Sequence, residues 1–211
     1  MIPKIIHQIH MGGSALSNQE EEWRNTWARH NPDWKLNLWD DEQISQLELF
    51  NKDAFDSCFN YSEKSDILRF EILYKFGGLY IDTDFECLKP ISNLLKNKDF
   101  AIFRQDDDVI CGAFIACSKF NINVKKLIDG IPKRFSIHKS TERSDIKYGP
   151  IYVTETLGIE SGLDPNFVYP YSWDEGYRCE ENFSITSPDS YAVHHWSGSW
   201  KDKSYLKKFG K

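Results

Sequence analysis

The amino-acid sequence predicts an α/β fold, in which helices pack against a layered sheet. Predicted strands and helices alternate through the first half of the 211-residue chain. Apolar residues make up 40% and charged residues 27% of the chain, as is typical of a globular domain with one core. No internal repeat, low-complexity tract or linker divides the sequence. We therefore expect a single domain over residues 1–211.

The first three elements follow from short-range patterns. Lys4–Ile9 is a short apolar run, and Trp34–Trp39 alternates apolar and polar residues, so both predict strands. Between them, Asn18–Arg29 has acids in its first turn and two tryptophans on one face. This pattern predicts an amphipathic helix.

Two further helices are predicted from the residues at their ends. Asp40 and Gln43 have the spacing of a capping box, and the helix that they open extends to Leu49. Ser62 can cap a longer helix that runs to Phe76. The glycine that follows is a typical residue just past a helix end.

The rest of the chain contains shorter signals. Leu79–Ile81 predicts a buried strand directly after a pair of glycines, and Phe85–Leu88 continues in extended form. The remaining predictions are strands at Phe100–Phe103, Ala113–Ala116 and Tyr191–Trp196, a helix at Asn123–Ile131 ended by Pro132, a polar loop at Phe135–Lys147 and a basic tail at Lys201–Lys211.

Charge and composition exclude several classes of function. The formal net charge is −6 at pH 7, whereas nucleic-acid-binding domains are usually basic, so duplex binding is disfavoured. The longest apolar run, Val109–Cys117, is far shorter than the ~20 residues of a membrane span. Without a signal peptide, we expect a cytoplasmic protein, and peripheral association with a membrane stays open. Five cysteines without a CxxC pair indicate free thiols.

Two aspartates directly follow the predicted strand Leu79–Ile81. Asp82 and Asp84 are two residues apart, so in extended backbone their carboxylates point to the same side. Neighbouring carboxylates repel each other unless a cation or a proton lies between them. The carboxyl end of a strand is where α/β sheets bind ligands, and Mn²⁺ or Mg²⁺ suits oxygen ligands and can bridge to a diphosphate. The alternative is a pair of loop aspartates that cap turns.

Two further pairs of residues could contribute to a site. Asp66 and Arg69 share a helix face, where they form either a surface ion pair or a donor–acceptor set for a polar ligand. His194 and His195 lie on the late predicted strand, so only one of them can face a given site. Neutral imidazole could complete a metal site, and a purely structural histidine is the alternative.

These residues belong to blocks that resemble a known family. Ile2–Ile9, Ser65–Phe70, Tyr74–Asp84 and His194–Trp200 are similar, in this order, to glycosyltransferases with a DXD sugar-binding region. That family includes yeast-type initiating mannosyltransferases and bacterial capsular or lipopolysaccharide sugar transferases. The middle blocks are also similar to the glucosyltransferase domains of large clostridial toxins. The pattern S-D-x-x-R followed by G-G-x-Y-x-D-x-D makes the resemblance specific, whereas a lone DxD would not.

The resemblance implies a GT-A fold, a Rossmann-like sheet with a nucleotide-sugar donor on one side and the acceptor on the other. It implies that Asp82 and Asp84 hold Mn²⁺ or Mg²⁺ with the donor diphosphate, and that Asp66 and Arg69 hold the donor sugar. These four are the candidate catalytic residues. The resemblance also makes His194, rather than its neighbour, the third metal ligand.

The same resemblance implies a nucleotide-binding role for Gln8, His10 and Tyr80. Relatives usually have a tryptophan at the position of His10, where it stacks on the nucleobase, and imidazole stacks more weakly. The implied function is retaining transfer of a sugar to a saccharide or other hydroxyl acceptor, in polysaccharide or glycoconjugate synthesis. No general base is required if the leaving phosphate takes the acceptor's proton.

Two other functions remain open from the sequence. Phosphohydrolases of the haloacid-dehalogenase type also end a strand in D-x-D, with the first aspartate as nucleophile. The usual position near the N-terminus and a downstream acidic motif are missing here. The third class is a noncatalytic sugar- or metal-binding module. Sugar release from nucleotide sugars would separate the transferase from both, and phosphate release from an aryl phosphate would favour the hydrolase.

Overall fold

The computed structural model describes residues 1–138, 143–171 and 187–197. Its main sheet consists of five strands, β1 (Ile5–Ile9), β2 (Lys35–Trp39), β3 (Gly78–Ile81), β5 (Phe100–Arg104) and β6 (Ile110–Cys117). Their spatial order is β2-β1-β3-β6-β5. The first three strands of this order are parallel, and β6 and β5 are antiparallel to their neighbours.

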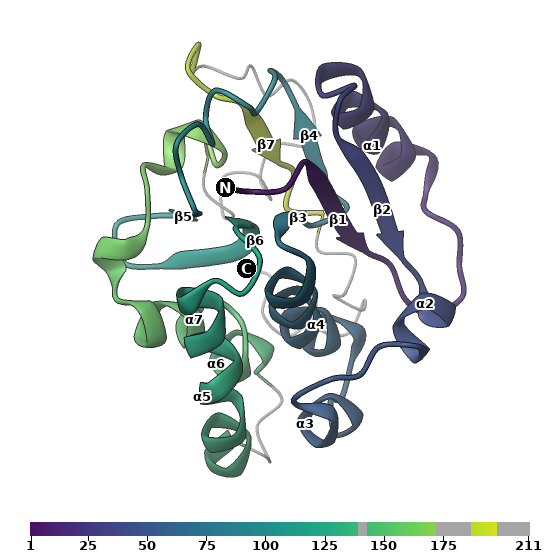
Figure 1. Cartoon of the computed structure of the whole chain (residues 1–211), viewed down its shortest axis with the longest axis vertical. Helices are drawn as coiled ribbons and strands as arrows, with labels where there is room; N and C mark the ends of the chain where they lie inside the picture. The colour runs from purple at the N-terminus through teal and green to yellow at the C-terminus, as the bar shows by residue number, and fades with distance from the viewer. Residues whose placement is uncertain (139–142, 172–186, 198–211) are drawn as a thin grey trace, which may run out of the picture.

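Helices and a two-stranded ribbon cover the two faces of this sheet. They are α1 (Asn18–His30), α2 (Asp41–Ser45), α3 (Lys52–Asp56), α4 (Tyr61–Phe76), α5 (Ile122–His138), α6 (Ser144–Lys147), α7 (Pro150–Leu157), the 3₁₀ turns η1 (Ile159–Ser161) and η2 (Pro165–Phe167), and the ribbon β4 (Phe85–Cys87) with β7 (Ala192–His194). Figure 1 shows α4, α5 and α7 on one side and α1 with the ribbon on the other. The predicted α/β class is confirmed. Within the described ranges, no helix has the length and apolar character needed to cross a bilayer.

Strand β3 contributes to both cores of the molecule. Leu79 and Ile81 pack toward α1, in a cluster that includes Trp27, whereas Tyr80 packs in the cluster formed by α4, α5 and α7. All four residues of β3 are buried. Because both faces are covered, the strand is a continuous apolar run rather than an alternating one.

Helix α4 is buried around most of its circumference from Asp66 to Leu73. It begins two residues earlier than the sequence predicts, because its N-cap is Asn60 rather than Ser62. The Asn60 Oδ1 atom accepts a hydrogen bond from the Glu63 N–H at 2.9 Å, which satisfies one of the free donors of the first turn. The helix ends at Phe76, as predicted.

The turn from α4 into β3 requires two glycines. Gly77 and Gly78 have φ angles of 63° and 103°, which side-chain-bearing residues rarely adopt. A Cβ atom on Gly78 would lie 2.5 Å from the Ile5 carbonyl oxygen of β1. The glycines therefore let β3 start against β1 immediately after the helix, and this places Asp82 at the far end of β3.

The predicted end of a helix at Pro132 is wrong, because α5 continues through this proline to His138. Proline has no N–H to donate to the carbonyl four residues earlier, which usually breaks a helix. Here the Ile128 carbonyl accepts a hydrogen bond from the Asn51 Nδ2 atom instead, at 3.1 Å. A side chain distant in sequence thus replaces the missing helical hydrogen bond.

Two other local predictions also need correction. The capping box of Asp40 and Gln43 is present, but its helix ends at Ser45 rather than Leu49. The Leu47 N–H bonds to the Ile44 carbonyl, a three-residue spacing that tightens the last turn and ends the helix. The predicted loop at Phe135–Lys147 contains the end of α5 and all of α6, with residues 139–142 outside the described part.

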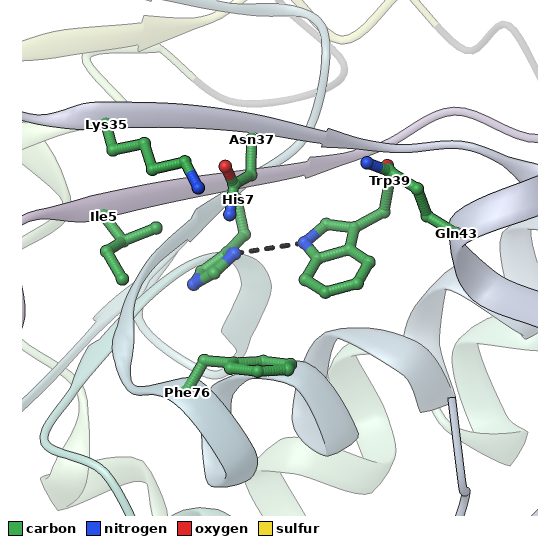
Figure 2. Close-up of a pocket in the computed structure, with 7 residues that line it drawn as sticks. All are labelled: Ile5, His7, Lys35, Asn37, Trp39, Gln43 and Phe76. Carbon is green, nitrogen blue, oxygen red and sulfur yellow. Dashed lines mark hydrogen bonds between the residues drawn. The ribbon is translucent and has the colours of Figure 1, made fainter. Parts of the chain in front are cut away.

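The predicted strand at Lys4–Ile9 contains a fully buried histidine, His7, that joins three elements. Its Nδ1 atom accepts a hydrogen bond from the Trp39 indole at 3.0 Å, and its Nε2 atom lies 2.9 Å from the Gly77 carbonyl oxygen. Figure 2 shows this imidazole beside Trp39 and Phe76. Indole can only donate and a carbonyl can only accept, so these partners hold the neutral tautomer with its proton on Nε2. Burial lowers the pKa of His7 to about 4.

We therefore expect acid to destabilise the fold between pH 6.5 and about 4. In this window the unfolded chain binds a proton at His7, whose ordinary pKa is 6.5, and the folded protein does not. The free energy of unfolding is therefore highest above pH 6.5, where His7 is neutral in both states. It falls progressively toward pH 4, by about 3 kcal/mol in total. Denaturant titrations at pH 7, 5 and 4 should show a smaller loss for His7→Gln than for the native chain. Equal losses in the two proteins would contradict this assignment.

Candidate functional site

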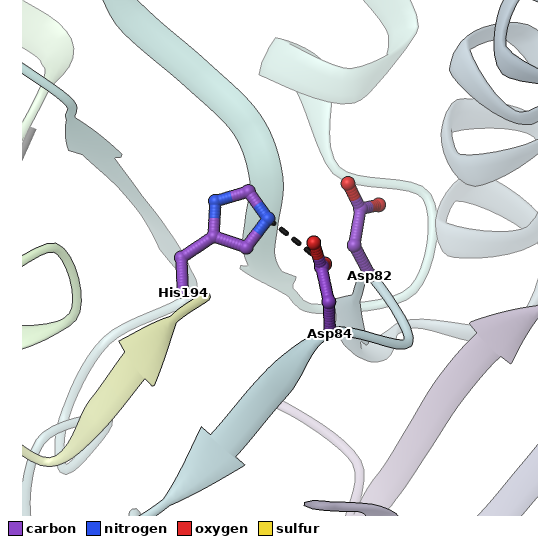
Figure 3. A group of neighbouring side chains, drawn as sticks. All are labelled: Asp82, Asp84 and His194. Atoms are coloured by element: carbon purple, nitrogen blue, oxygen red, sulfur yellow. Dashed lines mark hydrogen bonds and ion pairs between the residues drawn. The ribbon is translucent and has the colours of Figure 1, made fainter. Parts of the chain in front are cut away.

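Asp82 and Asp84 lie in the short connection between β3 and β4. The chain turns here, since the Phe85 N–H donates to the Asp82 carbonyl at 3.3 Å. The prediction that Asp82 and Asp84 lie in extended backbone is therefore wrong. A turn, rather than strand geometry, brings their carboxylates together. One oxygen from each of them and one ring nitrogen of His194 lie within 4.8 Å of one another (Figure 3).

His194 reaches this site because β7 pairs with β4. Phe85 and His194 are opposite each other in the ribbon, and their rings stack at a centroid distance of 4.5 Å. The His194 Nε2 atom lies 2.9 Å from Asp84 Oδ1, and the side chain is buried. The ribbon thus brings together two residues that are far apart in the sequence.

His195 faces the other side of the ribbon, as strand alternation requires. Its Nε2 atom lies 2.9 Å from Glu86 Oε2, and its ring stacks on Trp23 at 4.3 Å. His195 therefore belongs to a surface cluster with Glu86 and Trp23, on α1 and β4. Only His194 joins the two aspartates in the described metal-capable group.

Ser197 holds the second carboxylate in place. Both its N–H and its hydroxyl donate to Asp84 Oδ2, each at 2.9 Å. Trp196 makes this possible, because its left-handed φ of 51° turns the chain back toward Asp84. Burial alone would raise the pKa of Asp84, but the ion pair with His194 and the hydrogen bonds from Ser197 outweigh it and hold that pKa well below its usual range. Asp84 is therefore a carboxylate at neutral pH.

Arg69 connects Asp66 to Asp82. Its Nη2 atom lies 2.9 Å from Asp66 Oδ1 and 3.4 Å from Asp82 Oδ1. The Tyr80 hydroxyl donates to the same Asp82 oxygen at 2.7 Å, and the guanidinium lies 4.8 Å from the centre of the Tyr80 ring. Asp66 and Arg69 are each only 8% exposed in their side chains, so the alternative of a surface ion pair is wrong.

Arg69 serves the carboxyl groups of both Asp66 and Asp82. Burial raises the pKa of Asp66 to about 7; Arg69 opposes this shift, and the nearby Asp82 carboxylate adds to it. A divalent cation fits the group Asp82, Asp84 and His194, because carboxylate oxygens and neutral imidazole suit such ions.

Gln8 and His10 lie on and just beyond β1, beside β3. His7 pairs with Tyr80 in the parallel register, so His10 and Asp82 both lie past the carboxyl ends of adjacent strands. Gln8 is 1% exposed, and among the described residues neither polar atom of its amide has a hydrogen-bond partner. The His10 Nε2 atom lies 3.2 Å from the Ser14 hydroxyl.

The structure adds residues that sequence patterns did not single out. Tyr169 is 3% exposed, and its ring packs 5.8 Å from that of His194, yet it follows a 3₁₀ turn without any motif. Glu20 accepts a hydrogen bond from the Thr83 hydroxyl at 2.8 Å, which ties α1 to the turn between the aspartates. Ser17 and Glu20 form a capping box at the start of α1, and this spacing is visible in the sequence.

The mixed sheet, with carboxylates past the end of β3, defines the class of fold as GT-A. The chain superposes on the solved structure of PaToxG glycosyltransferase with a TM-score of 0.62, at 21% identity, over 75% of this chain and 70% of that one. It superposes on the glycosyltransferase GlyE of Streptococcus pneumoniae TIGR4 with a TM-score of 0.59, at 13% identity, over 93% of this chain and 55% of that one. These likenesses confirm the predicted fold.

Residues 17–101 match the family described as glycosyltransferase sugar-binding region containing DXD motif. This span includes Asp66, Arg69, Asp82 and Asp84, and the match agrees with the resemblance that the sequence indicates. The chain is 36% identical over 111 residues to inositol phosphoceramide mannosyltransferase 1 of Schizosaccharomyces pombe. The aligned segment covers 48% of this chain and 34% of that relative, so the chain spans only about a third of its length.

Proposed function

We propose that this chain transfers a sugar from a nucleotide-sugar donor to a hydroxyl of a saccharide or other acceptor, with the help of a divalent metal ion. The observation that carries the proposal is the juxtaposition of two groups. Asp82, Asp84 and His194 offer ligand atoms within 4.8 Å of one another, and the buried pair Asp66–Arg69 lies directly beside Asp82. The matched sugar-binding region contains all of these residues except His194.

Asp82, Asp84 and His194 would hold Mn²⁺ or Mg²⁺. When bound, the ion would neutralise the negative charge that develops on the leaving diphosphate. Ser197 keeps Asp84 ionised and oriented through two hydrogen bonds. Its role is therefore to prepare this carboxylate for a cation before any ligand arrives.

Asp66 and Arg69 would hold the donor sugar. Arg69 is held between two carboxylates and over the Tyr80 ring, so its remaining donors have a fixed direction. A fixed guanidinium and a carboxylate can bind several hydroxyls at once and orient the anomeric carbon toward the acceptor. Gln8 and His10 would contact the nucleotide, and the amide of Gln8, which has no hydrogen-bond partner within the described ranges, offers it both a donor and an acceptor.

The proposal includes retention at the anomeric carbon. In a front-face route the leaving phosphate itself can take the acceptor's proton, so no further base is required. The product class would be a polysaccharide or glycoconjugate. A phosphohydrolase with Asp82 as nucleophile is less well supported, because the Tyr80 hydroxyl and Arg69 both engage the same oxygen of Asp82 and would reduce its nucleophilicity.

A panel of nucleotide sugars tests the proposal. We expect the chain to release nucleoside diphosphate from at least one of them with Mn²⁺ or Mg²⁺, and to lose this activity in EDTA, because the leaving diphosphate then lacks a counter-charge. An aryl phosphate serves as the control substrate and should stay intact. Phosphate release from the aryl phosphate, without turnover of any nucleotide sugar, would support the hydrolase instead.

The two adjacent histidines provide a matched pair of variants. We expect His194→Ala to weaken Mn²⁺-dependent binding of a nucleoside diphosphate by roughly tenfold to a hundredfold, the range typical of perturbed metal sites. His195→Ala should leave this binding nearly unchanged, because its side chain contacts Glu86 and Trp23 on the other side of the ribbon. A calorimetric titration checks both variants. The reverse ranking would move the metal ligand to His195.

A further inference from the structure

An aromatic patch is exposed at the edge of the sheet opposite to Asp82. Phe50 and Phe120 are 66% and 61% exposed, and Tyr74 lies between them in edge-to-face contacts of 5.8 and 5.4 Å. Ile122, which is 66% exposed, follows two residues after Phe120. Solvent-facing apolar side chains that contact one another usually mark an interaction surface.

The position of this aromatic patch follows from the strand register. Gly78 at the start of β3 pairs with Cys117 at the end of antiparallel β6. Phe120 comes three residues after Cys117, whereas Asp82 comes directly after the other end of β3. The aromatic patch and the candidate site therefore lie at opposite edges of the sheet.

The ring of Phe120 is held in an unfavourable backbone conformation. Phe120 has a φ of 59°, in the left-handed region that bulky residues rarely occupy. Its N–H donates to the Tyr74 carbonyl at 2.9 Å, and the Phe50 N–H donates to Glu71 Oε2 at 3.1 Å. The rings are thus presented from a fixed backbone. Glycine or asparagine would suit the Phe120 turn better, so folding alone does not explain a phenylalanine there.

Lysines flank the aromatic patch although the whole chain is acidic. The Lys119 Nζ atom lies 4.9 Å from the centre of the Phe120 ring, and Lys75 extends over neighbouring Phe76. The same edge of the sheet also carries Lys35, the first residue of β2, and Lys4 before β1, which pairs with Asp33. Exposed rings without polar atoms, flanked by ammonium groups, complement a surface that is apolar inside and anionic outside.

We propose that the aromatic patch and its lysines dock the protein onto a bilayer that contains anionic lipid. Phe50, Phe120 and Ile122 enter the boundary between headgroups and acyl chains, and the lysines contact lipid phosphates. In a symmetric contact between two copies the lysines of both patches would face and repel each other, so the charge of this edge favours an anionic lipid surface over a second copy. Docking here leaves Asp82 and its neighbours facing the water, at the opposite edge of the sheet.

Sedimentation of the full chain with vesicles tests this proposal. We expect binding to vesicles of phosphatidylcholine with phosphatidylglycerol, much weaker binding to phosphatidylcholine alone, and weakening by salt. Phe120→Asn should reduce binding roughly tenfold to a hundredfold, the equivalent of one lost apolar ring. Its Tm should be equal or higher, because asparagine tolerates the left-handed φ. Lys119→Gln should reduce binding by roughly fivefold.

Ile137→Ser is the matched control. Ile137 is also exposed, at 61%, but it lies at the other end of α5 from Ile122, about 22 Å along the helix axis. We expect it to bind vesicles like the native chain. Turnover of nucleotide sugars without vesicles should be the same in Phe120→Asn as in the native chain, so loss of docking is measured separately from the proposed activity.

Several results would overturn the docking surface. One is equal vesicle binding by Phe120→Asn and the native chain, and another is equal binding to neutral and anionic vesicles. Absence of binding to either vesicle would have the same meaning. A concentration-dependent dimer that Phe120→Asn abolishes in sedimentation velocity would assign the aromatic patch to a contact between copies instead.

Discussion

Asp84→Asn is expected to abolish metal-dependent turnover, with a loss of roughly a thousandfold or more in kcat/KM. The carboxylate is one of two in the candidate metal group, and a bound divalent ion contributes several kcal/mol of charge stabilisation to such reactions. Asparagine keeps the shape of the side chain but removes its charge. It also turns one oxygen into an N–H₂ group, which cannot accept the hydrogen bonds that His194 or Ser197 makes to Asp84.

Turnover of a nucleotide sugar measures the loss in kcat/KM, calorimetry with a nucleoside diphosphate and Mn²⁺ measures the accompanying loss of metal-dependent binding, and circular dichroism checks that the fold persists. Glu86→Gln is the matched control, because Glu86 lies two residues further along and contacts His195 on the other side of the ribbon. We expect the control variant to bind the metal and the diphosphate normally. Retention of metal-dependent binding in Asp84→Asn would remove Asp84 from the site.

Arg69→Ala is expected to lower kcat/KM by roughly tenfold to a thousandfold, because a lost charged hydrogen bond is worth about 1.5–3 kcal/mol and more when it is buried. The variant should also be less stable. Removing Arg69 leaves Asp66 and Asp82 close together without their cation, and breaking a buried ion pair typically costs about 3–5 kcal/mol.

Arg69→Lys separates the two effects on activity and stability. Lysine keeps the charge for Asp66 and Asp82 but loses the planar fork that fixes several donors at once. We expect this variant to regain most of the lost stability and to remain impaired in kcat/KM. Lys52→Ala is the control ion pair, since Lys52 and Asp56 are exposed, and it should change stability by less than about 1 kcal/mol. Near-normal kinetics of Arg69→Lys and Arg69→Ala would make Asp66–Arg69 a structural pair.

Much of the fold could be predicted because its signals are local. The acidic first turn of α1, the cap of α2, the glycines after α4 and the apolar run of β3 each depend on residues within a few positions of one another. The block from Ser65 to Asp84 indicated the family for the same reason, since it combines a helix, its glycine turn and the aspartates in one continuous segment. Other features were missed because residues distant in sequence decide them.

The continuation of α5 through Pro132 is one such outcome. No pattern near Pro132 shows that its missing hydrogen bond will be replaced by Asn51, which is distant in sequence. The environment of Asp84 is another. Its carboxylate is held by His194 and Ser197, which reach it only because β7 pairs with β4.

Local spacing and apolar periodicity predict the α/β class and the residue types of the candidate site, and the blocks around them resemble the DXD glycosyltransferases. The burial of Asp66 and Arg69 beside Asp82 becomes visible only in the folded chain, which also places His194, the histidine that the resemblance selects, against Asp84. Burial and charge balance depend on which elements pack together. Residues 110 positions apart become neighbours only when β7 pairs with β4, and that pairing is a property of the folded chain.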